Sequence, residues 1–554
     1  MKNWSLTPSI HRPRSKFDLS HSIKTTMNVG DLVPFYVQEV YPGDTFKVDS
    51  TFVARATTPF IKPAMDNLFM DKYYFFVPAR LVWDKWQVLM GENTEGYWAN
   101  TEDVSVPQCV LDDNVAPQTI ANYMGIPSFN YGDSAEGEVR VSDLPFRSFA
   151  LIWNDWFRDQ NTQEPVFIDT SSATYVYADG VGNGWSAESY HDTCPKINKV
   201  HDYFTSCLPS PQKGEAVELP LTGDAPVITK NQNIVQRSDA TNITWASLGG
   251  NANALPQSWY NLAIKHTGGN GFNETSINTT AITAPTDYNI YPSNLWADLS
   301  NVTSATVNDL RFAFQLQKML ENDARGGTRY TEILQSHFGV VSPDARLQRP
   351  EYLGGSRSPL SIQQVTQSTG SDDQGAPLGQ VGAFSLSSGN CKFTKGFVEH
   401  GFVIGVCAIR YFHTYQQGIE RFWMRKNRTD FYLPVFSNIG EQPVYQTELY
   451  ALADPTAVFG YNEAWADLRY RPNKVTGYMQ SSISGSLDVW HFADDYANAP
   501  ILNGQFIAET GTNVDRTLTV GSENTPNFIV DFYVKNSAIR VLPTYSYPGL
   551  IDHH

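Results

Sequence analysis

The chain has 554 residues, of which 41% are hydrophobic and only 18% charged, and its net charge is −17. This composition provides for a large folded core and excludes an intrinsically disordered chain. The acidic balance disfavours a free-standing nucleic-acid-binding domain, because such domains are usually basic. Aromatic residues reach 13%. Since aromatic side chains favour strands and bury large areas, they predict a β-rich protein with extensive interfaces.

The five cysteines suit a reducing compartment. Their number is odd and no C-x-x-C pair occurs, so neither a disulfide framework nor a zinc ribbon is expected. The first residues lack the apolar core of a signal peptide. Residues 401–409 (GFVIGVCAI) are apolar but too few to span a bilayer as a helix. They predict a buried central strand, with Cys407 as an inert core thiol.

Strand patterns dominate the first eighty residues. Residues 31–40 predict a strand and residues 41–44 (YPGD) a turn. From residue 45, apolar and polar side chains alternate, which is the pattern of a half-buried strand. Residues 72–77 (KYYFFV) predict another strand, and residues 82–90 (VWDKWQVLM) a short helix. The apolar members of the alternating strand are Phe46, Val48, Phe52 and Ala54.

Residues 208–305 differ in character from the rest of the chain. They are rich in Asn, Thr, Ser, Gly and Pro, and they hold seven acidic and four basic residues. The stretch is too long for an ordinary connection, so it predicts a surface insertion with its own function, although a merely tolerated insertion remains an alternative. A helix is predicted to follow, with a capping box at residues 306–309 and an end at the pair Gly326-Gly327. Its predicted apolar stripe consists of Phe312, Leu316, Met319 and Leu320.

No catalytic signature stands out. The sequence has no Walker loop, no H-E-x-x-H and no G-x-S-x-G. The acidic pairs at 112–113 and 372–373 lie in polar stretches and are interpreted as solvated loop charge. The final Asp-His-His has metal-ligand residue types, but adjacent ligands on a tail are a weak signal, and an interface tail is the better interpretation. We therefore expect no enzyme, no cofactor and no metal site.

Two segments combine basic and aromatic side chains. Residues 410–428 (RYFHTYQQGIERFWMRKNR) hold five basic residues and one acid, with five aromatic residues between them. Such a segment suits stacking and phosphate binding on single-stranded nucleic acid. It equally suits a subunit interface, in which aromatics and Arg are enriched, and we favour the interface. Residues 462–476 carry the same ambiguity. The candidate interface or inner-wall residues are Arg410, Arg421, Trp423, Arg425, Arg428, Arg469 and Arg471.

Long segments spread over the chain resemble a known family. They include SKFDLSHSIKTTMNVGDLVPFYVQEVYPGDTFKVD (15–49), YYFFVPARLVWDKW (73–86), ARGGTRYTEILQSHFGV (324–340), RLQRPEYLGGS (346–356), HTYQQGIERFWMR (413–425), NEAWADLRYRPNKVTG (462–477) and PGLIDHH (548–554). Together they resemble the major capsid protein of the gokushoviruses, microviruses that are small icosahedral phages with single-stranded DNA. The weakest match is 208–305, which corresponds to the variable insertion of that family.

The resemblance implies a mainly β fold, a single viral jelly roll (an eight-stranded antiparallel β-barrel) with large inserted loops and a few short helices. Residues 31–207 and 306–554 would form its two parts. It also implies a T=1 icosahedral shell of sixty copies around circular single-stranded DNA. The insertion at 208–305 would build protrusions at the three-fold axes, used in host attachment. Candidate residues for the protrusion are Trp245, Trp259 and Trp296.

The N-terminal residues suit an inner face near DNA. Residues 1–30 hold five basic residues and one acid, so they form a basic arm on an otherwise acidic chain. The candidate DNA contacts are Arg12, Arg14, Lys16 and Lys24. Further partners expected from the resemblance are a small basic DNA-binding virion protein, a minor pilot protein and a receptor on the host bacterial surface. The protein would reside in the virion after assembly in the host bacterial cytoplasm.

A second class of function fits part of the same composition. Polar loops and many Trp and Tyr residues also suit a carbohydrate-binding or glycan-processing β protein. The missing secretion signal counts against that class. Particle size discriminates the two, because a capsid protein forms megadalton particles and a lectin or glycosidase forms small oligomers.

Overall fold

The computed structural model describes residues 13–92, 104–111, 114–133, 139–177, 185–186, 189–215, 217, 227–229, 244–248, 260–261, 289–292, 295–297, 307–326, 330–339, 348–366 and 381–545. The chain divides into two compact units. The larger unit consists of residues 1–213 and 321–554, and the smaller one of residues 214–320. The described chain is mainly β, with several antiparallel sheets, as the composition predicted.

The larger unit is built on a six-stranded antiparallel sheet. Its central strand β20 pairs with β4 on one side, and with β1 and β2, one after the other, on its second side. Beyond β4 lie β16 and then β15. The strands are β1 (Ser15–Asp18), β2 (His21–Met27), β4 (Thr45–Ala56), β15 (Ile362–Thr366), β16 (Val381–Gly396) and β20 (Phe528–Arg540).

Side chains of this sheet alternate between a buried and an exposed face. In β4, Phe46, Val48, Ser50, Phe52 and Ala54 are buried, and Lys47, Thr51, Val53 and Arg55 are exposed on the opposite face. The predicted half-buried strand is thereby confirmed. The turn before it is also confirmed, with the amide of Asp44 donating to the carbonyl of Tyr41 at 3.0 Å. Its Gly43 has a φ of +90°, a conformation that favours glycine.

A four-stranded antiparallel sheet forms the second layer, in the order β14–β5–β17–β3. Nearly every residue of its two inner strands, β5 and β17, is buried, as expected for strands covered on both faces. The prediction of a buried central strand at 401–409 is confirmed, and burial raises the pKa of the Cys407 thiol. The four strands are β3 (Val33–Val40), β5 (Leu68–Pro78), β14 (Glu351–Leu360) and β17 (Gly401–Tyr411).

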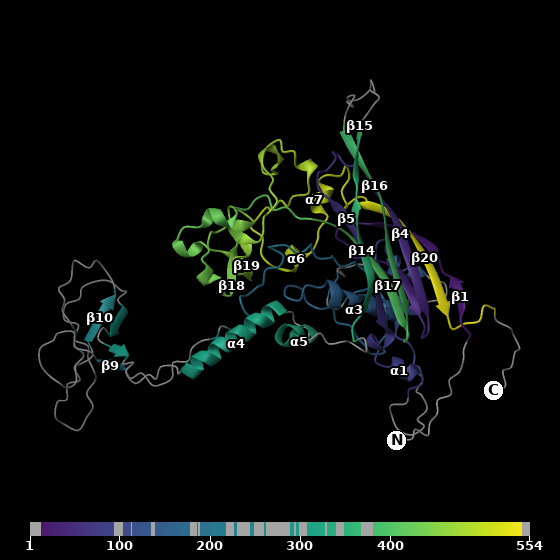
Figure 1. Cartoon of the computed structure of the whole chain (residues 1–554), viewed down its shortest axis with the longest axis horizontal. Coiled ribbons are helices and arrows are strands. Elements are labelled where there is room, and N and C mark those ends of the chain that lie inside the picture. The colour runs from purple at the N-terminus through teal and green to yellow at the C-terminus, as the bar shows by residue number, and fades with distance from the viewer. Residues whose placement is uncertain are drawn as a thin grey trace, which may run out of the picture. The chain divides into compact units, whose positions relative to one another are not determined.

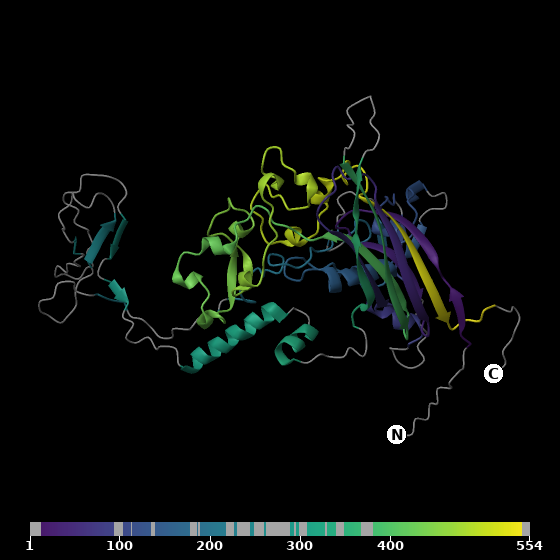
Figure 2. The ribbon, with the colours of Figure 1, turned by 45° about the horizontal axis from the view of Figure 1, so that its top comes forward.

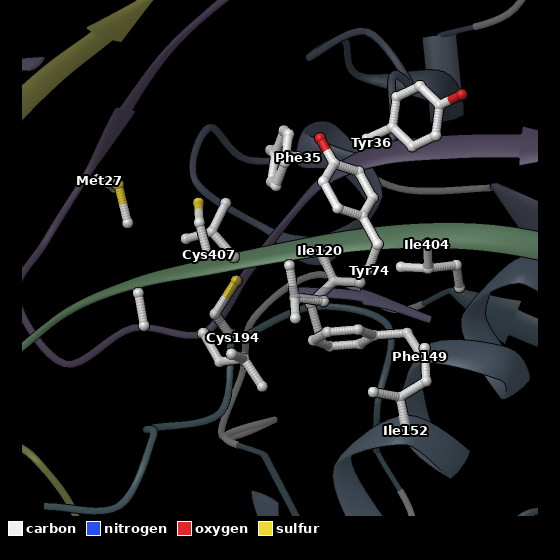
Figure 3. Packing of buried hydrophobic residues seen from close by; sticks show 14 of the residues in the cluster. Met27, Phe35, Tyr36, Tyr74, Ile120, Phe149, Ile152, Cys194, Ile404 and Cys407 are labelled. Atoms are coloured by element: carbon white, nitrogen blue, oxygen red, sulfur yellow. The ribbon is translucent and has the colours of Figure 1, made fainter. Parts of the chain in front are cut away.

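Aromatic side chains join the two sheets into a sandwich. The rings of Phe35 in β3 and Phe532 in β20 stack at 4.3 Å between centroids, and Tyr74 in β5 meets Phe393 in β16 at 5.0 Å. Figures 1 and 2 show the two layers side by side in both views. Figure 3 shows core side chains of β17, among them Ile404 and Cys407. Phe149, which comes from a helix, packs beside this strand. The helices there are α2 (Ile120–Tyr123) and α3 (Leu144–Ile152), which continues into a π-turn (Trp153–Phe157).

A second, smaller core supports a turn-rich lobe in the C-terminal third of the chain. It consists of nine buried residues, mostly aromatic, from segments near 203–207, 415, 444–459 and 506–507. Around it lie β18 (Glu441–Tyr445), β19 (Val458–Glu463) and α6 (Gly504–Ile507), with several 3-10 turns between them. The next helix, α7 (Thr512–Asp515), contributes Val514 to the sandwich core instead. Figure 1 shows β18, β19 and α6 close together in yellow-green.

The remaining described elements are short, apart from one helix. The helix predicted at 82–90 is shorter than expected, because only α1 (Trp86–Leu89) is α-helical and a 3-10 turn (Ala79–Leu81) precedes it. A small sheet joins β6 (Gln108–Leu111), β7 (Val139–Ser142) and β8 (Tyr175–Tyr177). The long helix α4 (Val307–Gly326) ends at the predicted glycine and contains the boundary between the units, and α5 (Tyr330–Phe338) follows it.

The smaller unit contains short antiparallel pairings. These involve β9 (Val227–Thr229), β10 (Thr244–Leu248), β11 (Tyr260–Asn261), β12 (Asn289–Pro292) and β13 (Leu295–Ala297). The stripe predicted on the following helix is not a buried face, since Phe312 and Met319 are exposed. Within the described residues, no helix is long and apolar enough to cross a membrane.

The contact between the sheets predicts a face-specific mutational response. Phe532 is fully buried against Phe35, and its neighbour Tyr533 lies on the exposed face of the same strand. Phe532→Ala should lower the free energy of unfolding by about 3–5 kcal/mol, because it empties a core position. Tyr533→Ala should change it by about 0.5 kcal/mol or less. Urea unfolding of the unassembled subunit measures both variants, and equal losses would contradict the sandwich packing.

Candidate assembly surface

The two basic, aromatic segments form one groove of about 650 Å³ in the turn-rich lobe. Residues 418–423 and 425 line it from the first segment, and residues 467–476 from the second. These two lining stretches are more than forty residues apart in the chain, so the fold, and not local sequence, brings them together. Five of the seven candidate interface residues lie in this groove: Arg421, Trp423, Arg425, Arg469 and Arg471.

The aromatic core of the lobe forms the floor of the groove. Tyr203 stacks on Tyr470 with ring centroids 5.2 Å apart, and Phe204 meets Tyr415 edge-on at 4.8 Å. All four residues line the groove. Aromatic pairs of this geometry add about 0.5–1.5 kcal/mol to the free energy of burial. The base of the groove is therefore formed by packed side chains of the lobe core.

Gly418 permits a close approach of two backbones where the first wall of the groove begins. A Cβ atom at this position would lie 1.8 Å from the carbonyl oxygen of Glu448. The next amide, of Ile419, donates to the carbonyl of Thr447 at 2.9 Å. Only glycine allows this close approach of two backbones. The segment is thereby fixed against residues 447–448 before it reaches Arg421.

The cations in the groove are paired within the chain. Arg421 donates from Nη1 to the carbonyl of Pro443 at 2.7 Å, and the same atom lies 3.8 Å from Glu448. Arg425 forms an ion pair with Asp467. Burial raises the pKa of the Glu448 carboxyl. Further ion pairs join Arg469 to Glu463, and both Arg471 and Lys474 to Glu420. Their positive charge is thus largely compensated before any partner arrives.

The aromatic side chains of the first wall, in contrast, are exposed to solvent. Trp423 is 72% exposed, and its ring lies 4.8 Å from that of Phe422, which is also exposed. Leu468 on the opposite wall is exposed as well. A patch of exposed aromatic and apolar side chains beside paired Arg residues has the composition of a protein–protein contact.

A buried histidine anchors the start of the first segment. Nδ1 of His413 lies 2.9 Å from Asp494, and its Nε2 lies 3.0 Å from Glu509. Burial alone would lower the pKa of His413, but the two carboxylates outweigh burial and raise this pKa to about 9. Burial likewise opposes ionisation of Asp494, yet His413 lowers its pKa to about 2. Lys199 also faces Asp494, at 3.7 Å.

Two of the seven interface candidates lie outside the groove. Arg410 is directed to Asp71, with Nε 3.0 Å from Oδ2, and lines a separate hollow of about 980 Å³. Asp71 is also held by Arg357, whose Nε lies 2.8 Å from Oδ1. Arg410 therefore has an internal role in joining β17 to β5. Arg428 is exposed at the start of a 3-10 turn (Arg428–Asp430).

The candidate DNA contacts and protrusion residues fall in different places. Lys16 lies on β1 and Lys24 on β2, where Nζ of Lys24 is 3.7 Å from Asp531. Arg14 is exposed just before β1. Trp245 lies on β10 and Trp296 on β13, which belong to different small sheets. Arg12 and Trp259 lie outside the described residues.

Sequence reasoning missed the acidic partners in the groove. Glu448 and Asp467 each sit next to a basic candidate only in the folded chain, and neither belongs to a recognisable motif. The role of His413 was missed for the same reason, because Asp494 and Glu509 are eighty or more residues away. The one available signal was the density of aromatic residues around His413, which indicates burial.

A β-sandwich that carries a groove of paired arginines and exposed aromatics has the features of a subunit of a protein assembly. The comparisons with known proteins agree. A family model described as "Capsid protein (F protein)" matches residues 5–550. The chain is 40% identical to capsid protein VP1 of Spiroplasma virus 4 over 566 residues, which cover 99% of this chain and 97% of that protein.

Two further capsid proteins VP1 are each 38% identical to this chain, those of Chlamydia phage 1 and of Bdellovibrio phage phiMH2K. The matches cover 99% and 98% of this chain, and 98% and 96% of the relatives. The chain therefore belongs to the phage capsid protein (F protein) family. This membership confirms the resemblance to microvirus capsid proteins and a structural, non-enzymatic role in a virion. It favours the capsid class over the alternative of a carbohydrate-binding or glycan-processing protein.

The His413 cluster predicts a specific pH dependence. The folded-state pKa of about 9 lies above the ordinary value of 6.5, so the stabilisation is complete below pH 6.5 and is lost as the pH rises through 9. In this window the free energy of unfolding should fall by an amount on the order of 3 kcal/mol more in the wild type than in His413→Gln. Urea unfolding of the unassembled subunit at several pH values measures this difference.

The exposed His21 provides the control. His21→Gln should retain the wild-type pH profile, since this ring packs on Tyr36 at the edge of the sandwich and is far from the cluster in sequence. An unchanged profile in His413→Gln would refute the role assigned to the buried histidine.

Proposed function

We propose that this capsid protein assembles into a T=1 icosahedral shell of sixty copies that encloses circular single-stranded DNA, and that the groove of the turn-rich lobe is a contact between copies. Family membership supports self-assembly into a shell. The observation that carries the assignment of the contact is the exposed Trp423 beside arginines whose charges are already paired. Shells of identical subunits close through repeated contacts of this kind.

The proposed fold of the subunit is a single viral jelly roll. Consecutive strands β3, β4 and β5 alternate between the two sheets, and so do β16 and β17. The late strand β17 lies between the early strands β3 and β5, as Greek-key connections require. In this proposal β1 and β2 are additions that extend one sheet beyond the barrel. Its eight strands are β3, β4, β5, β14, β15, β16, β17 and β20.

We further propose that residues 208–305 form protrusions at the three-fold axes and contact the host surface. The support is compositional, since the segment is polar and rich in glycine and adds little to a core. Because many copies act together, weak individual contacts to a surface receptor suffice. A small basic DNA-binding protein and a minor pilot protein complete the proposed particle, because an acidic subunit cannot neutralise packaged DNA alone. Assembly is placed in the host bacterial cytoplasm.

Truncation of the exposed tryptophan tests the assembly contact. Trp423→Ala should lower the yield of particles at least tenfold and change the free energy of unfolding of the subunit by less than about 1 kcal/mol, because the side chain is exposed in the free chain. Phe167→Ala is the matched control, since Phe167 is 70% exposed and lies outside the groove. Sedimentation of lysates measures particle yield. Normal yields from Trp423→Ala would remove the support for this contact.

Replacement of residues 230–290 by a short Gly/Ser linker tests the attachment role. The resulting particles should assemble and package DNA, because the segment is proposed to lie outside the shell core. They should bind host cells at least tenfold more weakly than wild-type particles in a sedimentation assay with labelled particles. Normal infection by the shortened particles would place attachment elsewhere, for instance at the five-fold vertices.

A further inference from the structure

The exposed face of the six-stranded sheet is a positive surface on an acidic protein. Alternation along its strands buries one set of side chains in the sandwich and leaves the other set on the open face. The charged members of the open set are six basic residues and three acidic ones, whereas the whole chain carries −17. They are Lys16, Lys24, Lys47, Arg55, Lys392 and Lys535, with Asp18, Asp49 and Asp531.

Strand register distributes these cations over the face. Lys535 in β20 pairs with Asp49 in β4, which in turn pairs with Lys392 in β16. Lys47 lies two residues before Asp49, on the same face, and Arg55 lies near the far end of β4. Neighbouring strands are about 4.8 Å apart, and alternate residues of one strand about 6.6 Å apart. The cations therefore form a broad field and not a single pocket.

Only two of the six cations form a close ion pair within the described residues of the chain. Lys24 pairs with Asp531 at 3.7 Å, and Lys392 with Asp49 at 3.1 Å. Among the described residues, by contrast, Lys16, Lys47, Arg55 and Lys535 form no close ion pair, although Lys16 and Lys535 both act on the charge of Asp18. The groove of the lobe shows the opposite arrangement, in which each cation has a carboxylate partner.

The residue types on this face suit a nucleic acid better than a second copy of the chain. Five of the six cations are Lys. The uncharged positions hold small polar side chains together with exposed apolar ones such as Val53, Leu386 and Ile529. Lys and Ser are depleted at protein–protein interfaces, but both are common donors to phosphate oxygens. Tyr533 is 49% exposed and lies two residues from Lys535, so it offers a ring for base stacking. The small polar members are Ser22, Thr26, Thr51, Ser388, Asn390 and Thr394.

We propose that this open sheet face binds the phosphate backbone of single-stranded DNA, and thus forms the part of the inner wall that holds the genome. The inference rests on the proposed function of the chain as a shell around such DNA. The basic N-terminal arm enters β1 at the edge of the same sheet, and two of the four residues predicted to contact DNA, Lys16 and Lys24, lie on this face. The bases would be held by stacking, without hydrogen bonds that distinguish one base from another, so binding is independent of DNA sequence.

Binding of the unassembled full chain to a labelled oligodeoxythymidylate tests this proposal. The variant Lys47→Gln/Arg55→Gln/Lys535→Gln removes three unpaired cations from the face. The slope of log binding constant against log salt concentration should become shallower by about 2, since each lost contact to a single strand contributes about 0.7. Fluorescence anisotropy measures the binding. The control Lys85→Gln/Lys213→Gln/Lys318→Gln removes three exposed cations outside this sheet and should keep the wild-type slope. A slope unchanged in the face variant overturns the proposal.

Particles of the same variant separate DNA binding from shell contacts. They should form in normal yield but hold less DNA, as measured by the ratio of absorbance at 260 and 280 nm. Loss of all particles with unchanged oligonucleotide binding would make the face a contact between copies, and would overturn the proposal.

A second measurement does not depend on variants. Ultraviolet crosslinking of wild-type full particles should attach DNA to peptides of β4 and β20. Crosslinks confined to other strands would also overturn the proposal. Failure of the wild-type chain to form any particle would instead refute the proposed function, while oligonucleotide binding stays measurable.

Discussion

Burial of alternate side chains along β4, β16 and β20 against β5 and β17 is the constraint on which the rest of the structure depends. Because a strand has a period of two, fixing one face in the core fixes the other face outside. The stacking of Phe35 on Phe532 sets the register between the layers. The same packing holds the ends of β17 and the residues after it, from which the turn-rich lobe is built.

The structure divides positive charge between two surfaces of different chemistry. In the groove, arginines are paired with Glu420, Glu448 and Asp467, and the open groups are aromatic. On the sheet face, three of the five lysines form no close ion pair with a described residue, and both small polar and exposed apolar side chains lie between them. Desolvating a paired Arg beside an aromatic ring costs less than desolvating an unpaired Lys, which suits a dry contact between copies. An unpaired Lys field that stays hydrated suits a polyanion, because counterion release drives that association.

Local patterns made the strands predictable and left the sites only partly so. The alternation in β4, the apolar run of β17 and the end of α4 at Gly326 depend on neighbours in the chain, and all three predictions are confirmed. The basic, aromatic segments were recognised by composition, but their meeting in one groove depends on contacts across more than forty residues. The helix predicted at 82–90 was too long, since its apolar residues serve the sandwich core, where Trp83 is buried. The burial of Lys72 could not be predicted either. This side chain is fully buried between the sheets, and burial lowers its pKa to about 8.

The central claim is that this capsid protein meets its own copies through the groove of the turn-rich lobe. Electron cryo-microscopy of purified particles tests it most directly, because one reconstruction gives the symmetry and the surroundings of every exposed side chain. The account predicts an icosahedral shell of sixty copies in which a neighbouring copy covers Trp423 and Phe422. A shell in which both rings remain open to solvent would contradict it.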